Sequence, residues 1–130
     1  MVRLAIVGCT GKLGSAIMKS ALHREDVEIS YAVARKGNPF VGKRISELVG
    51  GEWDLPIIDD IEAAEDCDVF IDCTNAETFM NDSYFKYERM GKALVIATTG
   101  FSCKAIENIG RLAAAMPVFL YFFSASFELK

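Results

Sequence analysis

The sequence has few residues of the kinds that build metal centres. It contains four cysteines and one histidine in 130 residues, and no two cysteines are spaced as Cys-x-x-Cys. Because a structural zinc ion needs four convergent Cys or His ligands, we predict no metal site and interpret the thiols as small apolar packing groups. The single histidine, His23, falls at the end of an expected helix, where an imidazole commonly interacts with the helix C-terminus.

The sequence also lacks a segment that would direct it to a membrane. Met1 leads straight into a short apolar stretch without a basic leading region, and no apolar run is long enough to span a bilayer. The 14 Lys and Arg residues are scattered and the net charge is −4, whereas nucleic-acid binding needs a concentrated basic face. We therefore expect a cytoplasmic protein that binds neither membranes nor nucleic acid.

Hydrophobic residues make up 52% of the sequence and fall into alternating strand and helix patterns. The alternation predicts an α/β fold, a doubly wound parallel sheet of the Rossmann type, in a single domain over residues 1–130. The apolar segment 116–123 fits either a central strand or a partner-binding surface. Strands are expected over residues 2–7, 27–33, 55–58, 68–73, 93–97 and 117–123, and helices over 12–23, 43–48, 60–65, 74–91 and 102–115.

Several polar residues stand at the expected ends of these elements. Thr74 and Glu77 have the Thr-x-x-Glu spacing of a capping box, and Ser102 is expected to cap the helix that it precedes. Asp59 and Asp60 resemble a carboxylate pair, but they precede a helix and are expected to cap it. Asp72 lies within an apolar strand, so its carboxylate must be hydrogen-bonded or lie near a ligand-binding loop.

The strongest local signal is the glycine-rich segment Gly-Cys-Thr-Gly-Lys-Leu-Gly, residues 8–14. It follows an expected strand and opens an expected helix, which is the setting in which glycines let the backbone approach a pyrophosphate. A turn with a purely structural role is the alternative. The residues predicted to hold the pyrophosphate are Gly8, Gly11, Lys12, Leu13 and Gly14.

The end of the second strand indicates which dinucleotide is bound. Enzymes that prefer NAD usually place an acidic residue there to accept hydrogen bonds from the ribose 2′-hydroxyl, but here the position is Ala34. The next residues, Arg35 and Lys36, carry charges that would hold a 2′-phosphate. We therefore predict NADPH as cofactor, with NADH possible. A solvated pair of surface charges is the alternative interpretation.

Four motifs occur in one order along the chain: IVGCTGKLG, ARKGN, DVFIDCT and GKALVIATTGFS. Together they resemble 4-hydroxy-tetrahydrodipicolinate reductase, also called dihydrodipicolinate reductase, of lysine and diaminopimelate biosynthesis. The resemblance implies hydride transfer from NADPH to a cyclic imine-like dicarboxylate. It also implies a nicotinamide pocket framed by Cys73, Thr74, Thr98, Thr99 and Gly100.

The resemblance departs from the family pattern near the end of the sequence. Phe122, Ser126 and Glu128 stand where the family has Asn, Gly and Asn. The family's substrate-binding domain, which supplies a histidine pair and a lysine, has no counterpart here. We therefore expect no catalytic residue in this chain and no reductase activity from it alone.

Three hypotheses remain open at this point. The chain is the cofactor domain of such a reductase, either truncated or a fragment, whose partner is a substrate domain or a second copy of the chain. Alternatively, it is a non-catalytic NADPH-binding or regulatory module that derives from the reductase. In the third hypothesis, the altered last strand is a non-functional tail.

Overall fold

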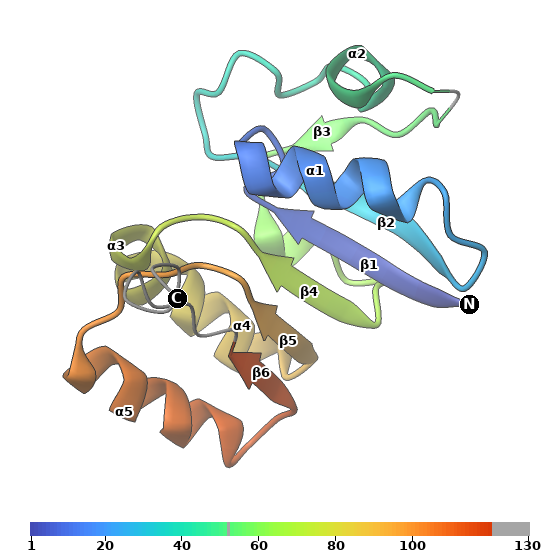
Figure 1. The fold of residues 1–130 in the computed structure, drawn as a ribbon. Coiled ribbons are helices and arrows are strands. Elements are labelled where there is room, and N and C mark those ends of the chain that lie inside the picture. Colours follow the sequence, from blue (N-terminus) through green and yellow to red (C-terminus); the bar gives the residue numbers. More distant parts are fainter. Residues whose placement is uncertain (52, 121–130) are drawn as a thin grey trace, which may run out of the picture.

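A single parallel sheet forms the centre of the fold. The computed structural model describes residues 1–51 and 53–120. The strands are β1 (Val2–Val7), β2 (Val27–Val33), β3 (Ile57–Ile58), β4 (Val69–Asp72), β5 (Ala93–Ile96) and β6 (Val118–Leu120). They pair in parallel in the order β3-β2-β1-β4-β5-β6 (Figure 1). The strand order reverses between β1 and β4, which in such sheets opens a crevice at the carboxyl ends of the strands.

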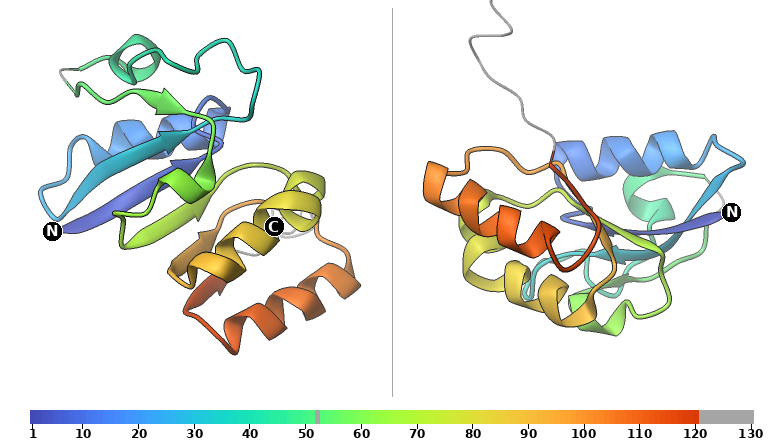
Figure 2. Two further views of the ribbon diagram at one scale, coloured as in Figure 1. Left: turned by 180° about the vertical axis from the view of Figure 1, so that it is seen from behind. Right: turned by 90° about the horizontal axis from the view of Figure 1, so that it is seen from below.

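Helices cover both faces of this sheet. They are α1 (Lys12–Ala21), α2 (Ser46–Val49), the 3-10 helix η1 (Ile61–Ala63), α3 (Ala76–Thr78), the π-helix η2 (Phe79–Ser83), α4 (Tyr84–Met90) and α5 (Cys103–Ala113). α1 and α2 lie on one face, whereas α4 and α5 lie on the other (Figure 2). The predicted doubly wound arrangement of the Rossmann type is therefore confirmed.

Two hydrophobic clusters, one on each face of the sheet, make up the core. Leu4 and Ile6 of β1 belong to the cluster that contains Met18 of α1, while Ala5 and Val7 belong to the cluster on the opposite face. Successive side chains of a strand point to opposite faces, so β1 is buried on both. Burying one such aliphatic side chain stabilises the fold by about 1.5–3 kcal/mol.

Two of the three expected helix caps are confirmed and one is wrong. Asp60 and Ser102 cap η1 and α5, accepting hydrogen bonds from backbone amides at 3.0 and 3.1 Å. The helical segment after β4 is capped by Asn75, whose side chain accepts from the amide three residues later at 2.8 Å. Thr74 does not cap it, because its hydroxyl donates to the buried carboxylate of Asp72 at 2.7 Å. A carboxylate is the stronger acceptor and fixes the threonine rotamer.

Several elements are shorter than the sequence predicted. The helix expected over 43–48 begins only at Ser46, because Arg44 is extended and forms a bridge with Pro56. β6 is described over Val118–Leu120 and forms an edge of the described sheet, with Phe119 62% exposed, so within the described residues this segment is not a central strand. The rest of the expected strand, 121–123, lies outside the described residues. The departures Phe122, Ser126 and Glu128 lie outside the described residues.

None of the helices in the described ranges is long and apolar enough to cross a membrane.

Candidate functional site

The loops that follow β1, β2 and β4 enclose a crevice at the carboxyl edge of the sheet. Two adjoining cavities, of about 380 and 340 Å³, make up this crevice. It lies where the strand order reverses, which is the position at which open α/β sheets bind their ligands. The residues that line both cavities are Gly8, Ala34, Arg35, Thr74 and Thr78.

The glycine turn after β1 has two positions at which no side chain fits. Gly8 has a φ of +83°, and a Cβ there would lie 2.6 Å from the carbonyl oxygen of Cys73. A Cβ on Gly14 would lie 2.2 Å from the carbonyl oxygen of Gly8. Gly11 differs, because the nearest atom to a Cβ there would be 3.6 Å away. Gly8 and Gly14 therefore shape the turn, whereas Gly11 keeps its crevice side free of a side chain.

α1 begins directly at this turn. Its N-cap is Gly11, which offers no side-chain cap, and the first turn of the helix contains no acidic residue. The first amides of a helix have no partner within the helix, so they are donors toward an anion at this position. Lys12 and Leu13 supply two of these amides, but their side chains do not line either cavity of the crevice. The side chain of Leu13 is 47% exposed on the α1 face of the sheet.

The residues expected at the nicotinamide end fall into two groups. Cys73 and Thr74, after β4, line the crevice. Thr98, Thr99 and Gly100 follow β5 and do not line either of its cavities. Thr98 is buried, and Gly100 has a φ of +88°.

Thr99 lies on the face of the sheet that α1 covers, in an apolar cavity of about 600 Å³ that Leu13 also lines. The side chains of Ile71, Val95 and Phe119 form the sheet side of this cavity. The structure thus brings Thr99 and Leu13 together, but away from the glycine turn's crevice.

The loop after β2 borders the crevice with two cations. Ala34 is buried at the end of the strand, and Arg35 and Lys36 are exposed and line the larger cavity. Neither cation takes part in the ion pairs formed within the described ranges. Asn38, which the sequence reasoning missed, donates from Nδ2 to Thr10 Oγ1 at 3.1 Å and ties this loop to the glycine turn. The Asn-Pro pair that follows Gly37 is a turn signal that could have drawn attention to it.

A buried carboxylate joins the loops that follow β4 and β5. Asp72 is fully buried, and its Oδ1 accepts from the hydroxyls of Thr74 and Thr98, each at 2.7 Å. Its Oδ2 accepts from the hydroxyl of Tyr87 at 2.5 Å. Burial and the neighbouring carboxylate raise the pKa of Tyr87 well above its ordinary value, so the phenol remains a donor. The expectation that Asp72 is hydrogen-bonded is confirmed.

The two cysteines beside the glycine turn are protonated at neutral pH. Burial, together with the charge of Asp72, raises the pKa of Cys73 to about 12. Burial raises the pKa of Cys9 to about 11. A thiol rather than a thiolate therefore faces the crevice. Across residues 1–51 and 53–120, no three His, Cys, Asp or Glu side chains gather as a metal ion would require.

Two carboxylates and a lysine also line the larger cavity, and of these the sequence reasoning missed Asp82 and Lys86. Asp59 follows β3, and Asp82 and Lys86 come from the helical segment after β4. The ammonium of Lys86 donates to Asp82 at 3.1 Å. Their spacing of four residues on an expected helix was the available signal.

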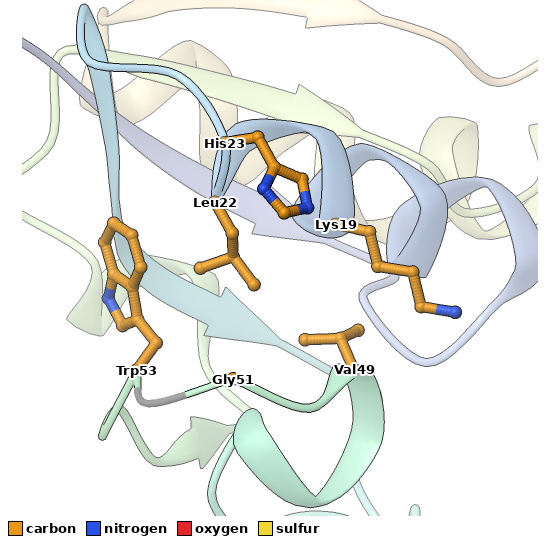
Figure 3. Close-up of a pocket in the computed structure, with 6 residues that line it drawn as sticks. All are labelled: Lys19, Leu22, His23, Val49, Gly51 and Trp53. Carbon is orange, nitrogen blue, oxygen red and sulfur yellow. The ribbon is translucent and has the colours of Figure 1, made fainter.

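A further cavity, of about 520 Å³, lies at the other end of α1 (Figure 3). His23 lies there, just after the helix end, as the sequence predicted, with its ring above Leu22 in this view. None of its lining residues lines the crevice. They are Lys19, Leu22, His23, Val49, Gly51 and Trp53.

A family model and two curated relatives name the same reductase. A family model described as "Dihydrodipicolinate reductase, N-terminus" matches residues 2–122. A 4-hydroxy-tetrahydrodipicolinate reductase of Aromatoleum aromaticum is 36% identical over 118 residues, covering 90% of this chain and 42% of the relative. The 4-hydroxy-tetrahydrodipicolinate reductase of Hahella chejuensis is 33% identical over 120 residues, covering 91% of this chain and 45% of the relative. The chain therefore spans less than half the length of these curated relatives.

Solved structures show the same fold. The structure of dipicolinate-bound dihydrodipicolinate reductase from Paenisporosarcina sp. TG-14 matches with a TM-score of 0.62 at 24% identity, covering 87% of this chain and 43% of that chain. Aspartate semialdehyde dehydrogenase with NADP from Candida albicans matches with a TM-score of 0.68 at 14% identity, covering 92% of this chain and 42% of that chain.

Proposed function

This chain belongs to the family of dihydrodipicolinate reductase N-terminal domains, and from that premise we propose that its crevice binds a reduced nicotinamide dinucleotide. The observation that carries the proposal is the turn in which Gly8 and Gly14 leave no room for a Cβ, ahead of a helix start without a side-chain cap. Gly8 and Gly11 leave space for the pyrophosphate, and the amides of Lys12, Leu13 and Gly14 donate hydrogen bonds to it.

The adenosine end of the cofactor belongs to the loop after β2. Arg35 and Lys36 are exposed at the crevice, and the residue at the end of β2 is the buried, apolar Ala34 rather than a carboxylate. Asp59 and Asp82 also line this cavity, and Asp82 is paired with Lys86. A 2′-phosphate would meet two cations there, and a guanidinium can bind it through two hydrogen bonds. This charge arrangement favours NADPH over NADH.

The nicotinamide end belongs to the loops after β4 and β5. Cys73 and Thr74, which line the crevice, are assigned to one side of the ring. Thr98, Thr99 and Gly100 are assigned to the same end on family membership alone, since they do not line either cavity of the crevice. The bound cofactor supplies the hydride. The residues of this chain hold the ring and exclude water. The raised pKa of Cys73 keeps its thiol neutral at this end of the crevice.

On the basis of its family membership, we assign this crevice to a reductase that acts on a cyclic imine-like dicarboxylate. Reduction of such a substrate also needs an acid that delivers a proton. The side chains assigned to the nicotinamide end of this chain offer only a thiol of raised pKa and hydroxyls. We therefore expect this chain to bind the cofactor without turnover, and a substrate domain or a second copy of the chain to be its partner.

Fluorescence titration with NADPH and with NADH tests the proposal. We expect tighter binding of NADPH, and Arg35→Ala should weaken NADPH binding about tenfold while leaving NADH binding within about twofold of the wild type. Lys104→Ala, which removes an exposed charge from α5, is the matched control and should change neither. Equal affinities in the wild type, or tighter NADH binding, would refute the assignment of Arg35 and Lys36.

A further inference from the structure

The carboxylate of Asp72 stands out among the buried groups of this chain. It is 0% exposed at the centre of the sheet, where it pairs in register with Val7 of β1 and Ile96 of β5. Within residues 1–51 and 53–120, no lysine or arginine forms an ion pair with it. Burying a carboxylate costs several kcal/mol unless hydrogen bonds satisfy it, so its partners must compensate.

Hydroxyl and amide donors from three separate segments satisfy this carboxylate. Oδ1 accepts from the amide of Thr74 at 3.1 Å and from the hydroxyls of Thr74 and Thr98, both at 2.7 Å. Oδ2 accepts from Tyr87, which is fully buried in α4. Oδ1 therefore bonds to the loops that follow β4 and β5, whereas Oδ2 bonds to Tyr87 in the core.

The tyrosine has little freedom to move. Its ring packs against Phe70 of β4 and Phe79 of η2, with centroid distances of 5.1 and 5.8 Å. A ring held in this way fixes the direction of its hydroxyl and therefore the plane of the carboxylate that accepts from it. Tyr87 does not line the crevice, so it acts on the crevice only through Asp72.

We propose that Asp72 is a positioning residue, which Tyr87 orients and which holds Thr74 and Thr98 so that the loops after β4 and β5 keep one arrangement at the nicotinamide end of the crevice. The role rests on the proposed function. It also changes the part played by Thr98, whose hydroxyl hydrogen is engaged by the carboxylate and is not available to the cofactor. Thr98 is buried and does not line the crevice, so its part is to fix the loop after β5.

Binding of a whole cofactor and of a fragment separates this role from a merely structural one. NADPH contains the nicotinamide, whereas 2′-phospho-ADP-ribose lacks it and occupies only the adenosine and pyrophosphate parts. We expect Asp72→Asn and Tyr87→Phe to weaken NADPH binding about five- to tenfold, and to leave the fragment's affinity within about twofold. The fluorescence of bound NADPH should also shift toward its emission in water, because the ring is less enclosed.

Tyr84→Phe is the matched control. It removes a tyrosine hydroxyl from the same helix, where Tyr84 donates to the carbonyl oxygen of Asn108 at 2.9 Å and forms no hydrogen bond with the carboxylate of Asp72. It should lower stability without changing the ratio of the two affinities. Should Asp72→Asn not fold, Tyr87→Phe carries the same test, since it leaves the carboxylate in place.

The outcomes distinguish the two proposals. If the wild type binds neither NADPH nor the fragment, the proposed function fails and the positioning role fails with it. If the wild type binds both, and the folded variants lose both equally or lose neither, only the positioning role is overturned. Hydrogen exchange of the ligand-free chain gives an independent check, because Tyr87→Phe should speed exchange at the Thr74 amide, whereas Tyr84→Phe should not.

Discussion

A methyl group at Gly8 is the sharpest test of the turn that begins the crevice. At a φ of +83°, an alanine adopts a backbone conformation that costs about 1–2 kcal/mol. Its Cβ would lie 2.6 and 2.8 Å from the carbonyl oxygen and carbon of Cys73, which are backbone atoms that cannot rotate away. Overpacking of this kind adds about 1–3 kcal/mol. We therefore expect Gly8→Ala to lower the free energy of unfolding by about 2–5 kcal/mol.

The same substitution should weaken cofactor binding. Relief of the contact requires the loops after β1 and β4 to separate, and both Gly8 and Thr74 line the crevice between them. We expect NADPH to bind about tenfold more weakly or worse, because the amides at the start of α1 no longer face the diphosphate. Urea unfolding gives the stability, and fluorescence titration at a temperature where the variant is folded gives the affinity.

Substitutions at two other glycines serve as controls, because they separate the cost of backbone strain from the cost of the close contact with Cys73. Gly91 has a φ of +64° with no atom within 4 Å of an added Cβ, so Gly91→Ala should cost about 1–2 kcal/mol from strain alone. Gly110, within α5, also has nothing within 4 Å and has no positive φ, so Gly110→Ala should stabilise by about 0.5–1 kcal/mol. If Gly8→Ala costs no more than Gly91→Ala, the reasoning about the close contact with Cys73 is refuted.

Three further predictions follow from groups outside the turn. Asn75→Ala should lower stability by about 1 kcal/mol in urea unfolding, because it removes the helix cap at 2.8 Å; an unchanged midpoint would contradict that cap. Iodoacetamide at pH 8 should modify the exposed Cys103 well before the partly buried Cys73, whose pKa is raised to about 12; modification of Cys73 first, as followed by mass spectrometry, would contradict this. Arg89 lowers the pKa of Glu62, so their pairing stabilises the fold above the unfolded-state pKa of about 4.3 and is lost as pH falls through the lower folded-state pKa. Arg89→Gln should therefore flatten the fall of Tm below about pH 5, and an unaltered Tm profile would count against the pair.

The sequence was sufficient to predict the sheet and its covering helices, because both depend on periodicity. Segment 2–7 alternates between two buried faces, and the helix that starts at Lys12 presents one apolar side. The extent of elements was less predictable. The helix expected over 43–48 starts late because Arg44 is held in a bridge with Pro56, a contact between residues twelve apart that no local pattern reveals.

The site was predictable where it depends on backbone conformation and not where it depends on tertiary contacts. The glycine spacing identified Gly8 and Gly14, whose closeness to other backbone atoms the structure displays. The capping box at Thr74 was wrong, because the hydroxyl has a stronger acceptor in Asp72, oriented from the core by a tyrosine fifteen residues away in sequence. Local spacing cannot reveal such a competitor.

The π-helix η2 determines in which direction around the helix axis the side chains of α4 point. In an α-helix each residue advances by about 100°, and a π turn contains one residue more per hydrogen-bonded loop, so the two sides of η2 do not share one helical period. Asn75 starts the segment at the crevice, whereas Tyr87 meets the carboxylate beneath the loops. Deleting a single residue within Phe79–Ser83 would turn Tyr87 by about 100°. Changes of length in these five positions should therefore harm the domain more than changes of side chain.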